Sequence, residues 1–208
     1  MRRALLMMVL FGGVVSAQVP KEPEAVPDRF TVKHKPKNYP QGTPKEVLNS
    51  AIEATAAGRA DYLVAHLLDP AFVEARIAER ARFLEPGIEG ELVELRNNQR
   101  LRPGSVTASE RLPDDPRAFR AIALKVAQDR AIRQVMADVQ ARIVDDPDAL
   151  KLLRRFLREG TFADSDPTAK ATLPDVKDHA VFFKKIGDRW FLENRHTEAP
   201  APMPSTMP

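Results

Sequence analysis

The chain contains no cysteine among its 208 residues. Without a thiol it forms no disulfide, offers no cysteine nucleophile or thiolate metal ligand, and carries no lipid-modified cysteine. Its four histidines do not have the spacing of a metal-ligand motif, and neither a glycine-rich phosphate loop nor a nucleophile elbow is present. The sequence therefore predicts neither a metal site nor a bound cofactor.

Excess charge of one sign is also scarce. The formal net charge is +3 with a pI near 9.3, and Arg2 and Arg3 contribute two of the three excess positive charges. A chain this close to neutral lacks the positive field that is typical of nucleic-acid binding. We therefore expect no nucleic-acid partner.

Long hydrophobic runs are absent except at the N-terminus, where two arginines precede an apolar stretch over residues 4–15. About twelve residues in a helix reach only ~18 Å, less than the ~30 Å hydrocarbon core of a bilayer. Val15 and Ala17 place small side chains where signal peptidase requires them. The pattern predicts a signal peptide over residues 1–17, cleaved after Ala17, and a secreted or periplasmic protein with no membrane span.

Proline outnumbers glycine by 18 to 9 and gathers at the two ends of the chain. Residues 18–42 read as a proline-rich extended leader, although Phe30, Val32 and Tyr39 could dock on the domain. Residues 197–208 read as a disordered proline-rich tail. A single domain is expected between them, over residues 43–196.

The first part of this domain has helical patterning. Thr43-Pro44-Lys45-Glu46 is a capping box with proline at the first helical position, which predicts a helix to about Ala57. Residues 88–113 fit either a short strand pair or a helix. The other expected helices cover 61–68, a segment from Phe72 to near Pro86, a long bent helix or two abutting helices from 116 to 143, and 146–159.

After Gly160 the hydrophobic period changes to two, which predicts a strand over 169–173. Gly187-Asp188 then joins two further strands in a hairpin with a type II′ or I′ turn. This register pairs Ile186 with Arg189, Lys185 with Trp190, Phe183 with Leu192, Val181 with Asn194 and His179 with His196. The order predicts an α+β fold, with N-terminal helices packed on a C-terminal curved antiparallel sheet.

Four features together carry a resemblance: the capped helix from Thr43 to Leu48, the break at 57–59, the helix end at Leu68-Asp69-Pro70 and the terminal strand from Lys185 to Leu192. The pattern resembles the cone-shaped α+β superfamily of nuclear-transport-factor-2-like proteins, over roughly 43–70 and 169–195. The resemblance implies helices wrapped around a curved sheet and a small molecule held in the cone. Residues 116–159 would be an additional helical segment.

The resemblance also implies candidate catalytic residues, because isomerases and dehydratases of that superfamily use Asp, His and Tyr side chains inside the cone. The candidates here are Tyr62, His66, Asp69, His179 and Asp178. Tyr62 and His66 lie four residues apart and share a helix face, and Asp69 follows one turn later.

Apolar residues of the hairpin provide candidates for a pocket lining. Trp190, Phe183, Leu192 and Val181 share one face of the predicted sheet, although residues of this kind more often form a core. The sequence offers no convincing set of acid, base and nucleophile. It therefore favours a non-catalytic module that binds a small ligand or an envelope protein. Two alternatives stay open: a cofactor-free isomerase, dehydratase or hydrolase-like enzyme, and a structural envelope protein.

Overall fold

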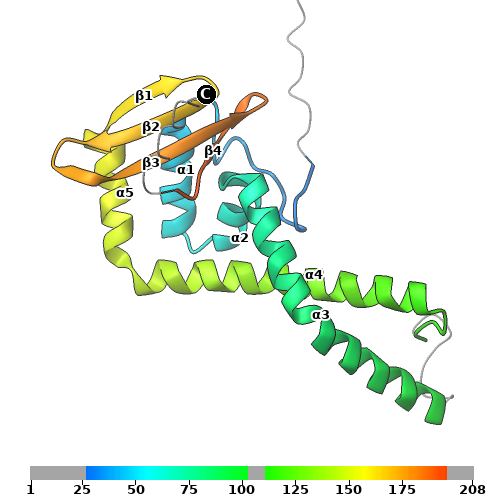
Figure 1. The fold of residues 1–208 in the computed structure, drawn as a ribbon. Coiled ribbons are helices and arrows are strands. Elements are labelled where there is room, and N and C mark those ends of the chain that lie inside the picture. The colour runs from blue at the N-terminus through cyan, green and yellow to red at the C-terminus, as the bar shows by residue number, and fades with distance from the viewer. Residues whose placement is uncertain (1–26, 103–110, 196–208) are drawn as a thin grey trace, which may run out of the picture.

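A computed structural model describes residues 27–102 and 111–195. Within these ranges the chain forms helices first and then a four-stranded antiparallel sheet in the order β1-β2-β3-β4, so the predicted α+β class is confirmed (Figure 1). The predicted signal peptide and the C-terminal tail lie outside the described residues.

The first helix, α1 (Pro44–Ala56), begins as predicted. Thr43 Oγ1 accepts a hydrogen bond from the Glu46 N–H, and the Glu46 carboxylate accepts one from the Thr43 N–H. These two bonds satisfy donors that the end of a helix otherwise leaves free. The apolar face of α1, with Val47 and Leu48 fully buried, is the centre of the first hydrophobic core.

The expected helix over 61–68 is instead a short turn, α2 (Ala60–Tyr62), followed by a π-helical turn, η1 (Leu63–Leu67). The Leu68 N–H donates to the Leu63 carbonyl, five residues back, over 3.0 Å. Single π turns inside helices are often found at functional sites. His66 lies in this turn.

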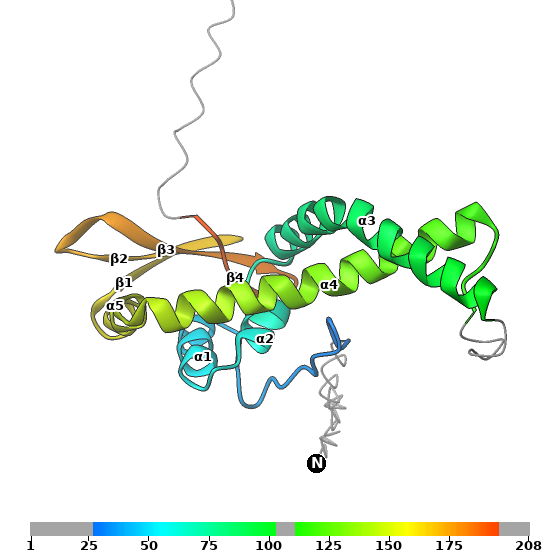
Figure 2. The ribbon, with the colours of Figure 1, turned by 90° about the horizontal axis from the view of Figure 1, so that it is seen from below.

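Helices α3 (Pro70–Leu101) and α4 (Pro116–Asp145) form a helical arm that extends from the body of the molecule (Figure 2). The predicted helix end near Pro86 is wrong, and 88–101 is helical. Proline removes one backbone hydrogen bond, but residues on both sides of it, Ala81 and Ile88, are buried against α4. Packing against α4 therefore stabilises α3 on both sides of Pro86, and the helix continues past it. Residues 116–143 belong to one continuous helix.

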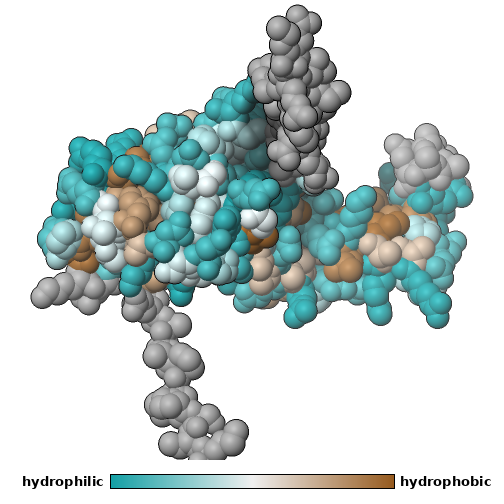
Figure 3. Space-filling model, turned by 90° about the horizontal axis from the view of Figure 1, so that it is seen from above, coloured by the Kyte–Doolittle hydropathy of each residue, from teal (hydrophilic) through white to brown (hydrophobic). Residues whose placement is uncertain are grey.

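The arm has its own, narrower core. Ala123, Ala127 and Ala131 of α4 are fully buried at a spacing of four residues against α3. Brown apolar surface alternates with teal polar surface along the outside of the arm (Figure 3). Phe83 on α3 is 80% exposed.

Helix α5 (Pro147–Glu159) leads into the sheet, which consists of β1 (Thr161–Ser165), β2 (Thr168–Leu173), β3 (Val176–Ile186) and β4 (Arg189–Leu192). Strand β1 was not predicted. Three predicted pairs of the hairpin are confirmed, because Ile186 lies opposite Arg189, Lys185 opposite Trp190 and Phe183 opposite Leu192. Gly187 has φ +59°, as its turn requires. Among the described residues the pairing ends at Leu192, before Asn194, the expected partner of Val181, and the expected pair of His179 with His196 lies outside the described residues.

Residues 27–42, called the strap below, run along α2 and η1 (Figures 1 and 2). Val32 and Tyr39 are half-buried against the core around α1, and Phe30 packs against the core of the arm. The second part of the expected leader is therefore attached to the domain through the three side chains singled out in the sequence.

Candidate functional site

The candidate pocket residues of the hairpin lie in the core. Trp190 and Phe183 are buried in one cluster with α1, and Val181 and Leu192 are half-buried against that cluster. Close packing leaves such side chains in contact with one another and with α1. Their place in the fold is the interface between the sheet and the helices.

The remaining acid–base candidates are Asp69, His179 and Asp178. Asp69 caps α3 by accepting a hydrogen bond from the Ala71 N–H, and it lies 3.8 Å from the ammonium of Lys184. His179 is exposed on β3. The side chain of Asp178 lies outside the described residues. Among the described side chains, Asp69 and His179 form no hydrogen bond, ion pair or ring contact with Tyr62 or His66.

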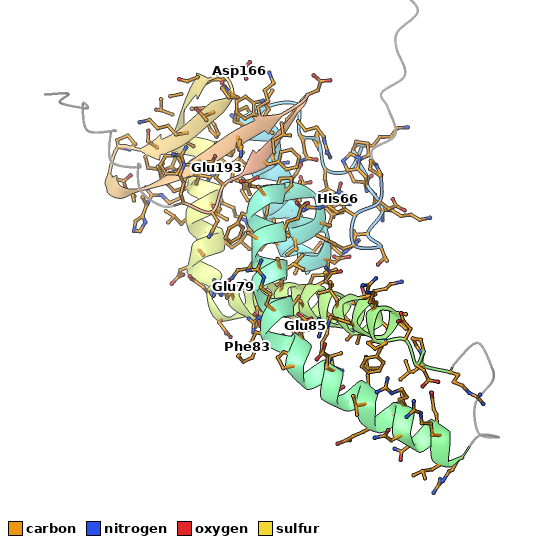
Figure 4. All side chains as sticks on the ribbon, turned by 45° about the vertical axis from the view of Figure 1, so that its right-hand side comes forward. His66, Glu79, Phe83, Glu85, Asp166 and Glu193 are labelled. Atoms are coloured by element: carbon orange, nitrogen blue, oxygen red, sulfur yellow. The ribbon has the colours of Figure 1, made fainter. Side chains whose placement is uncertain are left out.

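Tyr62 and His66 do lie together, and the strap adds two further rings to them. The ring centroids are 4.9 Å apart for Tyr62 and His66, 4.3 Å for Tyr39 and Tyr62, and 5.1 Å for His34 and His66. Tyr62 is fully buried and His66 is 2% exposed. Figure 4 shows His66 between the helices and the strap. We call these four residues the His–Tyr cluster.

Hydrogen bonds to this cluster hold the strap in place. His66 Nε2 lies 2.8 Å from the Val32 carbonyl, so it is the nitrogen that carries the proton and donates. The Lys35 N–H donates to the Tyr62 hydroxyl over 3.1 Å. At the far end of the strap, the Gln41 amide nitrogen donates to the carbonyls of His66 and Trp190.

Arg29 anchors the other end of the strap. Its guanidinium donates to the carbonyls of Ala65 and Pro70, each over 3.1 Å, and pairs with Glu74 at 2.9 Å. The Ala65 carbonyl lies in η1 and the Pro70 carbonyl at the start of α3, so Arg29 links the strap to both elements. The strap is therefore tied to η1 at both ends and in the middle.

The surroundings of the cluster disfavour positive charge on its histidines. Burial lowers the pKa of His66, and Arg189 and Arg29 lower it further, against the hydrogen bond to Val32 and the weaker effect of Asp28. Burial also lowers the pKa of His34, with His66 and Arg189 adding to the effect and Gln41 opposing it. Both imidazoles are thus held neutral near pH 7.

Several buried polar atoms around the cluster have no hydrogen-bond partner in the part of the chain that the structure describes. They are His34 Nε2, Gln41 Oε1 and one terminal nitrogen of Arg189. Gln41 is only 5% exposed. Buried donors and acceptors normally find partners, so this part of the strap interface is polar and incompletely satisfied.

Beside the cluster, a cleft of about 650 Å³ opens between the strap, α2 and α4. Its apolar lining is Phe30, Val32, Ile132 and Met136, and its charged lining is Lys33, Lys35, Arg59, Arg133, Asp61 and Asp129. The volume lies within the range of about 300 to 1,000 Å³ that is usual for small-molecule sites.

A strained turn forms one wall of this cleft. Phe30 and Thr31 have φ of +53° and +66°, and the backbones of Arg29 and Val32 pair on either side of them. L-residues other than glycine, asparagine and aspartate rarely adopt this left-handed conformation. Such strain persists only where surrounding contacts impose it, and it is common at sites that clamp ligands.

The sequence identified Tyr62 and His66 but not His34, Gln41, Arg189 or the cleft. The first pair could be found because four-residue spacing places side chains on one helix face. The contact between His34 and His66 joins residues on two separate segments, with no fixed spacing to reveal it. Positive charge in residues 33–37 was the one available signal for the cleft, and it also fits a solvated leader.

Comparisons of the chain with protein-family models, with curated proteins and with solved structures found no match. The resemblance to nuclear-transport-factor-2-like proteins therefore stays a prediction. Within residues 27–102 and 111–195, no group of three or more His, Asp or Glu is placed to hold a metal ion. No helix in those ranges combines the length and the apolar character needed to cross a bilayer.

Proposed function

We propose that this chain is an exported, non-catalytic binding module that holds a small amphipathic anion in the cleft between the strap, α2 and α4. Export rests on the predicted signal peptide. The choice of ligand rests on one observation: a cleft of suitable volume combines four apolar side chains with an excess of cations in its walls.

The charge argument starts from the pairs already formed. Arg59 and Asp61 make two hydrogen bonds, at 2.9 and 2.8 Å, and so neutralise each other. Among the described residues, Lys33, Lys35 and Arg133 form no ion pair. Asp129 is the one remaining carboxylate in the lining. A ligand carboxylate, sulfonate or phosphate would therefore meet three cations against one anion.

The apolar argument concerns the same walls. Phe30 and Val32 come from the strap, and Ile132 and Met136 come from one face of α4. A ligand with an aliphatic or aromatic body would remove these four side chains from water, which contributes about 25 cal/mol for each Å² buried. Methionine adapts its shape readily, which suits a site for flexible ligands.

Binding is preferred over catalysis because the acid–base candidates are engaged in the fold. The Tyr62 hydroxyl accepts from Lys35 and the His66 Nε2 proton is donated to Val32. A general acid or base needs a proton-transferring atom within hydrogen-bond reach of the substrate. Both atoms are instead covered by the strap.

Calorimetric titration of the full chain with decanesulfonate tests the proposal, and decyltrimethylammonium is the matched cation. We expect binding of the sulfonate alone, weakened about two- to fivefold by each of Lys33→Gln and Arg133→Gln, as for an exposed charge pair. Lys45→Gln, on the exposed side of α1, is the control and should bind like wild type.

Two results would contradict the proposal. The first is equal affinity for the anion and the cation, because the cation excess would then play no part. The second is sulfonate binding that is unchanged by both cleft variants, because the ligand would then lie elsewhere on the molecule.

A further inference from the structure

The strap is one wall of the cleft, covers the buried His66 and carries the half-buried His34. Phe30, Val32 and Lys33 face the cleft, while His34, one residue further, packs against His66. Movement of the strap away from η1 would therefore remove one wall of the cleft and expose both imidazoles at once. Ligand binding and histidine burial share a single structural element.

The charged groups around the imidazoles are known from each element that packs on them. The strap supplies Asp28 and Arg29, α2 supplies Tyr62, and β4 supplies Arg189. Glu74 of α3 is engaged with Arg29. Asp28 is thus the one carboxylate among them that acts on His66, against two guanidinium groups.

The neutral histidines have defined hydrogen bonds. His66 already uses its Nε2 proton on Val32, and the buried His34 Nε2 and Arg189 nitrogen have no partner among the described residues. An additional proton would bring a positive charge beside the half-buried Arg189, and among the described residues Asp28 and the unpartnered Gln41 Oε1 are the groups that offset it. Release of the strap into water relieves this repulsion.

We propose that the strap is an acid-released wall of the cleft: protons on both His34 and His66 free it from η1 and so discharge the ligand. The proton on His34 repels Arg189, and the proton on His66 repels Arg189 and Arg29. The ligand part of this inference rests on the proposed function, whereas the release of the strap does not.

The pH dependence of strap closure follows from the lowered pKa values of the two histidines. Both histidines have a pKa below the ordinary value of 6.5 while the strap is closed, and both approach 6.5 when it opens. The open state therefore binds more protons, and closure is most stable above pH 6.5. Closure weakens as the pH falls from 6.5 towards the lowered pKa values, by at most tenfold per pH unit for each proton taken up.

Hydrogen exchange of the full chain, measured by mass spectrometry at pH 7.5, 6.5 and 5.5 and corrected for intrinsic rates, tests the release. We expect peptides from 27–42 to lose protection below pH 6.5 while β2 and β3 keep theirs. The fluorescence of Trp190 gives a second readout, because Trp190 is the single tryptophan and its backbone forms hydrogen bonds with Gln41 of the strap.

Two variants and a control assign the protons. His34→Gln should reduce the loss of strap protection between pH 7.5 and 5.5, and His34→Gln with His66→Gln should abolish it. His179→Gln, an exposed histidine on β3, should behave like wild type. If the double variant does not fold, the reduced pH dependence of His34→Gln decides alone. Equal strap protection at pH 7.5 and 5.5, or an unchanged loss in His34→Gln, would overturn the proposal.

Decanesulfonate, which stays anionic throughout this range, separates the two proposals. Binding at pH 7.5 that is lost at pH 5.5 together with strap protection supports both. Strap release without sulfonate binding at either pH overturns the ligand proposal and leaves the acid release standing. Sulfonate binding that persists at pH 5.5 on a released strap overturns the discharge of the ligand.

Discussion

The helices at the centre of the molecule are covered on two sides by very different interfaces. On the sheet side, Trp190 and Phe183 pack against Val47 and Leu48 of α1, and all four are apolar. On the strap side, the contacts consist of ring stacking and hydrogen bonds around His66, with the partly exposed charges of Arg29 and Arg189 nearby. The sheet interface is apolar and closely packed, whereas the strap interface depends on polar contacts.

The difference has a physical consequence. Burial of apolar surface does not depend on protonation, so the sheet interface keeps its stability over a wide range of pH. An interface that relies on neutral buried histidines responds to pH near 6.5. The strap side also has strained backbone and unpartnered polar atoms, which are typical of sites where function has been favoured over stability.

The largest expected effect tests the sheet side. Trp190→Ala should lower the free energy of unfolding by about 3 to 5 kcal/mol, because it removes a large buried aromatic side chain from a closely packed core. Urea denaturation followed by circular dichroism measures the change. An unchanged denaturation midpoint would mean that the sheet is not packed on α1, and the comparison of the two interfaces would no longer hold.

The fold could be predicted from the sequence where local sequence signals agreed with the packing. The capping box located α1, and alternation with Gly187-Asp188 gave the register of β3 and β4, because these patterns reside within a few neighbouring residues. Strand β1 was missed because its residues Thr161 and Ala163 to Ser165 are exposed, so it has no buried alternation to detect.

Elsewhere, contacts between distant segments decided the structure. Helix α3 continues through Pro86 because Ile77, Ala81 and Ile88 pack against α4, a partner that no local pattern of α3 reveals. The candidate site was only half predictable for the same reason. Tyr62 and His66 share a helix face, but the strap residues that complete the cluster reach it through tertiary contacts.

The second prediction tests the strap side. A chain that begins at Gly42 should be less stable than a chain that begins at residue 27 by about 2 to 4 kcal/mol, since even one buried large side chain contributes about 1.5 to 3 kcal/mol. Val32 and Tyr39 would be lost, and Tyr62 and His66 would be uncovered. The capping box of α1 is intact in both chains.

Urea denaturation at pH 7.5 measures this difference. Equal midpoints for the two chains would show that the strap lies loosely on the domain, in which case the cleft would have no firm wall. At pH 5.5 the difference between the two chains should be smaller, because the closed strap then contributes less.

A third prediction concerns the strained backbone of the strap at Thr31. Thr31→Gly should stabilise the chain by about 0.5 to 1 kcal/mol, because relief of left-handed strain outweighs the extra freedom of glycine in the unfolded state. Thr55→Gly is the matched control: Thr55 lies in α1, where glycine is unfavourable, so this variant should be destabilised. If Thr31→Gly is destabilised like the control, the side chain of Thr31 contributes more than its strain costs, and the strap is better fitted to the fold than its backbone indicates.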